Sequence, residues 1–346
     1  MKAAFLTGLR KLEIGEAPEP RIQRDDEVLV RVDAVGLCGS DVHTYKEGGI
    51  GGARASYPWI LGHECAGTIL ATGRAAGGAK AGQRVAVDPL ISCNRCDQCL
   101  AGRKHTCRNQ KFLASPGQAP GALVERLVMP AECCHPIPDS MTAAAATLTE
   151  PLSIGLHSRS LAHLPPGGSA AILGSGPIGL CVLLALKQAG PVKVLMTDLI
   201  EERLDMARRL GADWTASAVR DDVPARAAEL FPAGVDRVFE CAGKQETVDQ
   251  ALAMLSPGGV LVLVGIPEVE RISFDIHTAR RRELALQNVR RQNRCMQPAI
   301  ELVASGKVKV DELATHHFDL AESREAFEMV SDYRDGVIKA IIHVTQ

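Results

Sequence analysis

The sequence predicts an α/β protein of two domains, in which a compact and mostly β domain precedes a doubly wound parallel sheet. The chain has 346 residues, whereas a single hydrophobic core usually stops growing at about 250–300 residues. Residues 1 to about 150 contain short β-type runs separated by Gly, Pro and Asp. From Pro165 onward, apolar strands alternate with helix-like segments, which is typical of a parallel sheet.

The first domain is predicted from strand-like segments at both ends of the chain. Val28–Val32 and Arg84–Val87 have the β-branched composition of strands. Near the C-terminus, the chain returns to a helix at Pro298–Ser305 and ends in a strand at Val337–Val344. We expect this tail to pack on the first domain.

The second domain is predicted from strands and helices that follow one another at short intervals. The predicted strands are Ser169–Leu173, Val192–Thr197, Val235–Glu240 and Gly259–Val264, and the predicted helices are Ile178–Ala189 and Glu201–Leu210. This alternation indicates βαβ units. The expected boundaries are 1–152 with 292–346 for the first domain, and 153–291 for the second.

Composition and charge argue against several classes of function. A formal net charge of -2 gives no electrostatic reason to expect nucleic acid or an anionic membrane as a partner. Met1–Leu12 lacks an apolar run long enough for a secretory signal, and Ala171–Leu186 is too short to span a bilayer. We therefore expect a cytoplasmic protein whose eleven cysteines are metal ligands or buried thiols rather than disulfides.

A glycine-rich turn with the sequence GSGPIG lies between a predicted strand and a predicted helix and fits the dinucleotide-binding pattern G-x-G-x-x-G. Gly174 permits the tight turn, Gly176 lets a pyrophosphate approach the backbone, and Gly179 lets the helix pack closely. The helix N-terminus offers free N–H groups to phosphate. Pro177 and Ile178 complete the cofactor-binding residues expected here. A glycine turn in an unrelated α/β fold is the alternative.

Asp198 ends the next predicted strand, about 20 residues beyond the turn, where a carboxylate binds the ribose hydroxyls of the cofactor. It would repel the extra phosphate of NADP, so NAD is the expected cofactor. Leu199 follows Asp198, where a basic residue could have received that phosphate. Arg203 leaves the use of both NAD and NADP as an alternative. Val264 and Ile266, after a later strand, are expected in the same site.

Four cysteines in one short loop form the strongest metal motif of the sequence: Cys93, Cys96, Cys99 and Cys107. Four thiolates satisfy the tetrahedral coordination of a structural zinc, which leaves no vacant position for chemistry. An iron–sulfur cluster is the competing interpretation. The polar residues between these cysteines argue against four unrelated core thiols.

A second group of metal-binding residue types lies in segments 38–43 (CGSDVH) and 62–64 (GHE). The two segments supply a thiolate, two imidazoles and two carboxylates. Taken singly, a cysteine in the core or a histidine bonded to a backbone carbonyl is more common than a ligand. Together, and ahead of a dinucleotide domain, they indicate an open zinc site.

The order of these motifs resembles the zinc-containing medium-chain dehydrogenase/reductase family over essentially the whole chain. Cys38 comes first, then His63 with Glu64, then the four-cysteine loop and the glycine turn. The resemblance implies a GroES-like catalytic domain and a Rossmann domain that binds NAD, with the active site in the cleft between them. It also implies two zinc ions per chain and a homotetramer, with a homodimer as the next choice.

The resemblance also implies roles for individual residues. Cys38 and His63 would be ligands of a catalytic zinc, and Glu64 or Glu150 would provide the third contact, directly or through water. Zinc would act as a Lewis acid that lowers the pKa of the substrate hydroxyl before hydride moves to the nicotinamide. Ser40 would accept the proton and His43 would pass it toward solvent. A structural surface histidine is the alternative for His43.

The segment 149–153 (TEPLS) resembles the sorbitol dehydrogenase branch, because alcohol dehydrogenases of the family usually have a cysteine at the position of Glu150. We therefore expect a secondary alcohol, and within that class a polyol or sugar alcohol, as substrate. Arg290 matches an arginine in the substrate cleft of that branch, and Phe112 is expected to line the same pocket. No nucleic acid or membrane partner is expected.

Sorbitol itself is not the only substrate that the sequence allows, because Thr44 and Arg291 differ from the residues usual at these positions in sorbitol dehydrogenases. L-Threonine 3-dehydrogenase is the runner-up, since it shares the motifs of the open site and the four-cysteine loop. A phosphorylated sugar alcohol is a third option, because arginines at 280–282, 290, 291 and 294 could bind phosphate. A non-catalytic NAD- or zinc-binding sensor is disfavoured by the complete set of catalytic residue types.

Overall fold

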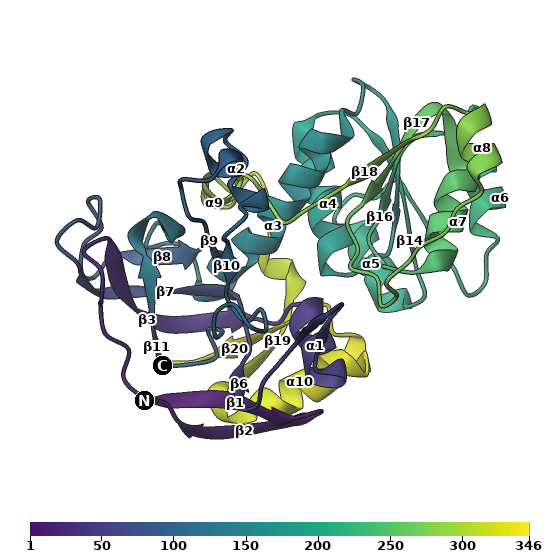
Figure 1. The fold of residues 1–346 in the computed structure, drawn as a ribbon. Helices are drawn as coiled ribbons and strands as arrows, with labels where there is room; N and C mark the ends of the chain where they lie inside the picture. The colour runs from purple at the N-terminus through teal and green to yellow at the C-terminus, as the bar shows by residue number, and fades with distance from the viewer. Residues whose placement is uncertain (346) are drawn as a thin grey trace. The chain divides into compact units, whose positions relative to one another are not determined.

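The computed structural model describes residues 1–345, which form two compact units (Figure 1). Unit 1 comprises Met1–Glu150 and the chain from Met296 onward, and unit 2 comprises Pro151–Cys295. The expected domain boundaries lie within a few residues of these. The first division falls inside helix α3 (Ala143–Ala162), so no loop marks it in the sequence.

Unit 1 is organised around a seven-stranded sheet in the order β12-β8-β7-β3-β20-β19, with β11 also pairing with β3. Its strands are β3 (Glu27–Gly36), β7 (Glu64–Thr72), β8 (Arg84–Val87), β11 (Arg126–Pro130), β12 (Cys134–Pro136), β19 (Ala314–Asp319) and β20 (Lys339–His343). The predicted strands in the first domain and at the C-terminus are confirmed. Because β20 pairs antiparallel with β3, the prediction that the tail packs on the first domain is also confirmed.

The core of unit 1 is built mainly from aliphatic side chains, as the low content of aromatic residues requires. Alternate residues of β3 are buried, among them Val28, Val30 and Val32, while Arg31 between them is exposed. This period of two is what a strand with one face on a core needs. Tyr45 and Phe327 add a tilted ring pair with centroids 5.1 Å apart.

Smaller elements complete unit 1. The strands are β1 (Lys2–Gly8), β2 (Lys11–Glu16), β4 (Gly49–Ile50), β5 (Ala53–Arg54), β6 (Trp59–Ile60), β9 (Leu90–Ile91) and β10 (Lys111–Phe112). The helices are α1 (Gly39–Glu47), α2 (Asp97–Leu100), α9 (Met296–Ala304) and α10 (Ser323–Ser331), with short 3-10 turns that include η1 (Lys104–Thr106) and η3 (Asp311–Leu313). The predicted helix near residue 300 is therefore confirmed.

Unit 2 is a six-stranded sheet in the order β15-β14-β13-β16-β17-β18, and every pairing in it is parallel. Its strands are β13 (Ser169–Leu173), β14 (Lys193–Asp198), β15 (Trp214–Ser217), β16 (Val235–Glu240), β17 (Leu255–Leu263) and β18 (Ala285–Asn288). The central strands are buried along nearly their whole length, as expected when helices cover both faces. The predicted doubly wound fold is confirmed.

The helices of unit 2 lie on both faces of this sheet (Figure 1). They are α4 (Pro177–Ala189), α5 (Glu201–Arg209), α6 (Val223–Leu230), α7 (Gln245–Met254) and α8 (Ile276–Arg281). The two predicted helices correspond to α4 and α5. The strands β15 and β18 and the helices α6 to α8 were not predicted, because their segments are short and mix apolar with charged residues. Strand β17 also begins four residues earlier than predicted, at Leu255 instead of Gly259.

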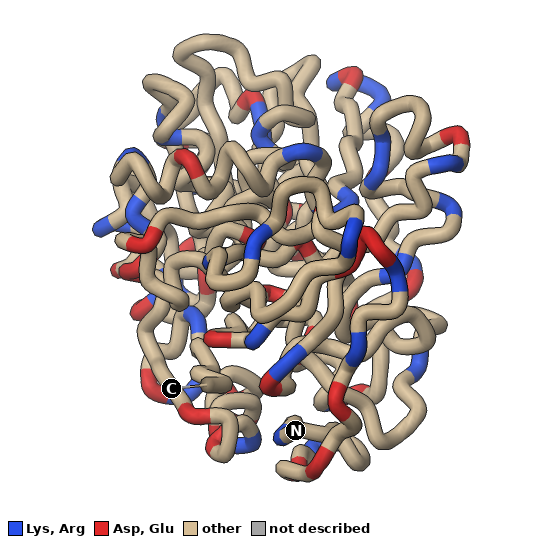
Figure 2. Tube along the Cα trace, turned by 90° about the vertical axis from the view of Figure 1, so that its left-hand side faces the viewer, with Lys and Arg blue, Asp and Glu red and all other residues tan. Residues whose placement is uncertain are grey.

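Charged residues are interspersed over the molecule. In the view of Figure 2, Lys and Arg alternate with Asp and Glu along the trace, in keeping with the net charge of -2. Within the described residues, no helix combines the length and the apolar character that crossing a bilayer requires.

Candidate active site and metal sites

The open metal site is assembled by the register of two antiparallel strands. Gly36, the last residue of β3, pairs with Glu64, the first residue of β7. Cys38 follows β3 by two residues and precedes helix α1, while His63 directly precedes β7. Ligand atoms of Cys38, His63 and Glu64 all lie within 4.8 Å of one another. The structure thus brings Cys38 to the adjacent pair His63 and Glu64, from which the sequence separates it.

Asp41 orients the imidazole of His63. Its Oδ2 lies 3.1 Å from Nδ1 of His63, and its Oδ1 accepts a hydrogen bond of 3.0 Å from the backbone N–H of Gly62. A carboxylate on one ring nitrogen fixes the tautomer and leaves the other nitrogen for a metal. Burial alone lowers the pKa of His63, but Asp41 and the Cys38 thiol raise it, and the net shift is well upward. From the sequence, Asp41 was counted among the carboxylates of the CGSDVH and GHE segments, but it was given no role.

Glu64 has a buried cationic partner, which the sequence analysis also missed. Nζ of Lys339 lies 2.8 Å from Oε1 and 2.7 Å from Oε2 of Glu64, and it donates to the carbonyl of Leu37 at 2.9 Å. Both side chains are almost fully buried, at 2 % exposed for Lys339 and 1 % for Glu64. The two residues are 275 positions apart, so no local pattern could have indicated the pair.

Glu150, the second carboxylate proposed for this site, lies in α3 and is buried. Burial raises the pKa of its carboxyl to about 8. The nearby His63 lowers this pKa, whereas the charge of Glu64 raises it further. Because both His63 and Glu64 affect this pKa, the carboxyl of Glu150 lies in the buried region that contains them. Of the two carboxylates, however, only Glu64 belongs to the group whose ligand atoms lie within 4.8 Å of one another.

The charges of these residues fit a divalent cation. Four acidic groups, Cys38, Asp41, Glu64 and Glu150, share the site with the ammonium of Lys339. Buried anions are costly unless cations or hydrogen bonds compensate them. A thiolate, an imidazole and a carboxylate are together the donor set that zinc accepts at catalytic sites.

His43, in α1, has both ring nitrogens buried, and neither has a hydrogen-bond partner in the part of the chain that the structure describes. Native proteins rarely leave buried polar atoms unpaired, so these nitrogens indicate a partner outside the polypeptide. This disagrees with the alternative of a surface histidine. Ser40 is half-buried in the same helix, and its carbonyl accepts a hydrogen bond of 3.0 Å from Oγ1 of the buried Thr44.

Phe112 contacts the metal-binding group directly. Its ring centroid lies 5.2 Å from that of His63, with the rings tilted by 54°. Phe112 is buried at the end of β10, which pairs with β9. Phe112 therefore lies beside the metal-binding group, and its expected contact with substrate stays a prediction.

The four-cysteine loop folds into a compact cluster in unit 1. Its four Sγ atoms lie within 4.8 Å of one another, and Cys96 Sγ lies 3.6 Å from that of Cys99. The backbone N–H of Arg95 is the main cause that lowers the pKa of Cys93 to about 6. Such N–H groups stabilise thiolates, the form that binds metal. The loop contains α2 and η1, and this arrangement fits a closed tetrahedral zinc site.

The glycine turn in unit 2 has the backbone that its sequence predicts. Gly174 has a φ of +100°, in the region that favours glycine, and its N–H donates to the carbonyl of Thr197. A Cβ on Gly179 would lie 1.9 Å from the carbonyl oxygen of Gly174, so this position requires glycine. Gly176 caps α4, with Pro177 as its first residue. A Cβ on Gly176 would meet only Arg203, at 3.7 Å, which leaves the space for a phosphate open.

Asp198 is the last residue of β14, and its carboxylate also binds the backbone of the glycine turn. Its Oδ2 accepts a hydrogen bond of 2.7 Å from Ser175 N–H, and its Oδ1 accepts one of 3.0 Å from Ile200 N–H. Each carboxylate oxygen can accept a further bond, so capacity for ribose hydroxyls is left. Nη1 of Arg203 lies 3.9 Å from Asp198 Oδ2. The geometry is consistent with the expected role and adds a structural one.

The segment after β17 is tied to the end of β16. Glu240, which the sequence analysis did not single out, is buried and accepts Val264 N–H at its carbonyl. Its carboxylate accepts the N–H groups of Ala242 and Gly243. Ile266 is 52 % exposed and therefore open to a ligand.

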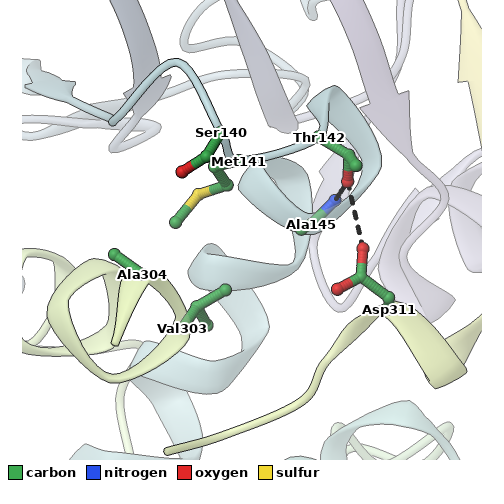
Figure 3. Close-up of a pocket in the computed structure, with 7 residues that line it drawn as sticks. All are labelled: Ser140, Met141, Thr142, Ala145, Val303, Ala304 and Asp311. Carbon is green, nitrogen blue, oxygen red and sulfur yellow. Dashed lines mark hydrogen bonds between the residues drawn. The ribbon is translucent and has the colours of Figure 1, made fainter. Parts of the chain in front are cut away.

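Arg290 and a small pocket lie apart from the metal-binding residues in the sequence and in the pocket lining, respectively. Arg290 follows β18 in unit 2 and is exposed, and its expected contact with substrate stays a prediction. A pocket of about 120 Å³ is lined by Ser140, Met141, Thr142, Ala145, Val303, Ala304 and Asp311 (Figure 3). Thr142 donates to Asp311 across it at 3.0 Å. Ligand pockets usually measure about 300–1,000 Å³, and none of the metal-binding residues lines this one.

Comparison with known proteins identifies the family. Residues 24–139 match the model of the alcohol dehydrogenase GroES-like domain, and residues 177–305 match that of the zinc-binding dehydrogenases. The chain is 36% identical to sorbitol dehydrogenase of Bacillus subtilis, over 99% of this chain and 97% of that protein. It is also 36% identical to L-idonate 5-dehydrogenase of Vitis vinifera, over 94% and 90%.

A solved structure agrees with these matches. A protein of Sinorhizobium meliloti, described as a zinc-binding dehydrogenase and bound to NADP, superposes with a TM-score of 0.90 at 30% identity, over 99% of each chain. The family that the motifs resemble is thus confirmed, and with it the GroES-like and Rossmann domains. The chain belongs to the zinc-containing medium-chain dehydrogenase/reductase family and is an oxidoreductase that uses a nicotinamide cofactor.

Proposed function

We propose that this enzyme transfers hydride from a secondary alcohol of a polyol or sugar alcohol to NAD. The observation that carries the proposal is the buried donor set of Cys38, His63 and Glu64, with Asp41 behind the imidazole. The names of two relatives, a sorbitol dehydrogenase and an L-idonate 5-dehydrogenase, support a substrate with several hydroxyl groups.

Different residues of the open site bind the metal, orient its histidine ligand and transfer the proton. When bound by Cys38 and His63, zinc supplies a Lewis acid for the substrate oxygen. Asp41 holds the imidazole in one orientation through its Nδ1. Ser40 accepts the proton of the substrate hydroxyl, and His43, whose nitrogens have no protein partner within the described residues, moves it onward.

Glu150 and Phe112 shape the preference for a polyol. A carboxyl group in this buried site can hydrogen-bond a second hydroxyl of the substrate. Phe112, beside His63, excludes water from one side of the metal-binding group. Arg290 is the further residue that we assign to substrate binding.

A second zinc belongs in the four-cysteine loop, which gives two zinc ions per chain. The closeness of the four Sγ atoms supports it, and an iron–sulfur cluster is the outcome that metal analysis would distinguish. NAD is the preferred cofactor because the Asp198 carboxylate would repel a ribose phosphate. One solved relative holds NADP, so the preference depends on this aspartate rather than on the family.

Homo-oligomers and a cytoplasmic location complete the proposal. β18 is an edge strand of the parallel sheet in unit 2, and an edge strand can pair with a second copy. Such a pairing supports a homodimer, and the resemblance to the family favours a homotetramer, with a homodimer next. All eleven cysteines are free, which suits a reducing compartment such as the cytoplasm.

The substrate class is tested by recording NADH formation with a series of alcohols. We expect the highest kcat/KM with sorbitol-like polyols or aldonic acids, and values lower by about tenfold or more with threonine and with simple secondary alcohols, because those compounds lack the second hydroxyl that Glu150 can bind. Phosphorylated sugar alcohols belong in the same series. Preference for threonine or for a phosphorylated substrate would contradict the proposal.

The Cys38→Ser variant tests the open metal site. Loss of the thiolate should remove one zinc per chain and lower kcat by about 1,000-fold or more, since the Lewis acid is lost, whereas NAD binding should persist. Zinc content by elemental analysis and NAD binding by fluorescence provide the two measurements. Cys134→Ala, which changes a buried cysteine outside both metal sets, is the matched control and should keep both zinc ions.

The Cys96→Ser variant tests the closed metal site. It should lose one zinc while the open site keeps its own, and the melting temperature should fall by roughly 10 °C, because loss of a structural metal costs several kcal/mol. Calorimetry together with zinc analysis checks this. An unchanged zinc content, or iron in place of zinc, would show that the loop has another role.

The Asp198→Asn variant tests cofactor choice. The wild-type enzyme should prefer NAD, and removal of the charge should shift the ratio of kcat/KM values toward NADP by about tenfold, the effect of roughly 1.4 kcal/mol. The asparagine oxygen can accept only one of the two backbone bonds at the turn, so the melting temperature should fall by a few degrees, and the cofactor ratio is therefore compared within the folded variant. Equal use of both cofactors by the unmodified enzyme would remove the role given to Asp198.

A further inference from the structure

Glu240 is a buried carboxylate that the proposed reaction does not use. It is 1 % exposed, and its Oε1 accepts hydrogen bonds from the backbone N–H groups of Ala242 and Gly243 and from the hydroxyl of Thr247, at 2.7–2.8 Å. Three donors on one oxygen stabilise the ionised form of a carboxyl group. Within residues 1–345, no ammonium or guanidinium group pairs with it. Glu240 therefore carries a buried negative charge that hydrogen bonds, rather than a cation, compensate.

Two loops of unit 2 hold this carboxylate in place. The carbonyl of Glu240 accepts the N–H groups of Val264 and Gly265, at 2.9 and 2.8 Å. A Cβ on Gly265 would lie 2.8 Å from Oε2 of Glu240 and 2.5 Å from the nitrogen of Gly243. The loops that follow β16 and β17 thus pack directly on the carboxylate, and backbone contacts fix the position of its charge.

Glu240 lies where the strand order of the parallel sheet reverses. β14 and β15 extend the sheet on one side of β13, whereas β16, β17 and β18 extend it on the other. Ligands of such sheets bind at this switch point, outside the carboxyl ends of the strands. Leu173, the last residue of β13, pairs with Glu240, the last residue of β16. The carboxylate is therefore placed at the edge of the sheet where a cofactor binds.

The site proposed for the cofactor assigns its two halves to opposite sides of this switch point. The pyrophosphate belongs to the glycine turn after β13, and the adenosine ribose belongs to Asp198 at the end of β14. The nicotinamide half then extends toward β16, and neighbouring strands are only about 4.8 Å apart. The glycine turn also contacts the loop after β16, since a Cβ on Gly174 would lie 3.0 Å from the nitrogen of Ala242. Glu240 is therefore on the nicotinamide side.

We propose that Glu240 determines specificity for the oxidation state of the cofactor, because its charge favours NAD⁺, with its cationic ring, over the neutral ring of NADH. The inference rests on the function proposed above and extends it. Charges attract more strongly in a buried site than in water, and a carboxylate that is already fixed needs no reorganisation when the cofactor binds. The adenosine and pyrophosphate are identical in the two oxidation states, so contacts with them cannot make this distinction.

The Glu240→Gln variant tests this inference by cofactor binding without substrate. The amide oxygen can accept the donors at Oε1, whereas the charge is removed. The Kd for NAD⁺ should rise by about fivefold or more, while the Kd for NADH should change by less than about twofold, because only NAD⁺ carries a positive charge on the ring. Titration followed by NADH fluorescence, and displacement of NADH by NAD⁺, give the two constants.

Two control variants separate the charge from a structural role. Asp236→Asn removes a carboxylate near the amino end of the same strand, where it accepts hydrogen bonds from Ser169, and should leave the ratio of the two Kd values unchanged. Thr247→Val removes one hydrogen bond to Glu240 and keeps its charge, so both Kd values should change by the same factor. A structural role predicts that Glu240→Gln raises both Kd values equally and lowers the melting temperature. That result, or two unchanged Kd values, would overturn the inference.

The Thr247→Lys variant keeps the test decisive if Glu240→Gln does not fold. It introduces an ammonium group beside the intact carboxylate, which Thr247 contacts at 2.8 Å, and should raise the Kd for NAD⁺ alone. An equal rise of both Kd values would contradict the inference. A wild-type protein that binds neither cofactor would contradict the proposed function instead. A wild-type protein that binds both and oxidises polyols, while Glu240→Gln leaves the ratio unchanged, would contradict only the role of Glu240.

Discussion

The antiparallel register of β3 and β7 is the constraint on which the open site depends. Because Gly36 pairs with Glu64, the chain that leaves β3 and the chain that enters β7 meet at one end of the sheet. A shift of one residue would turn the Glu64 side chain to the other face. β20 also pairs with β3, and this second pairing brings Lys339 to the carboxylate of Glu64.

Electrostatic balance is the second constraint on this site. Asp41, Glu64 and Glu150 are all nearly buried, and desolvation of three carboxylates is tolerated only when donors or cations surround them. Asp41 has a backbone N–H and the imidazole of His63, and Glu64 has Lys339. This buried group of acids beside a cysteine and a histidine creates a site suited to a divalent metal.

The cofactor turn is organised by close backbone packing together with one carboxylate, that of Asp198. The carbonyl of Gly174 occupies the space that a Cβ on Gly179 would need, so the turn and the first turn of α4 are packed against one another. Asp198 holds the same turn from the neighbouring strand through Ser175 N–H. Its carboxylate therefore links the shape of the turn to the choice of cofactor.

The sequence by itself determined the parts of this protein that depend on short spacing. The cysteines from 93 to 107, the turn from 174 to 179 and the buried strands β13, β14 and β16 follow from residue type and periodicity within a few positions. The order of the motifs also identified the family. Tertiary structure alone decided which carboxylate joins Cys38 and His63, and the pairing of Lys339 with Glu64. It also decided that the nitrogens of His43 have no partner among residues 1–345. These features arise where strands distant in the chain meet, and contacts between distant strands leave no periodic signal in the sequence.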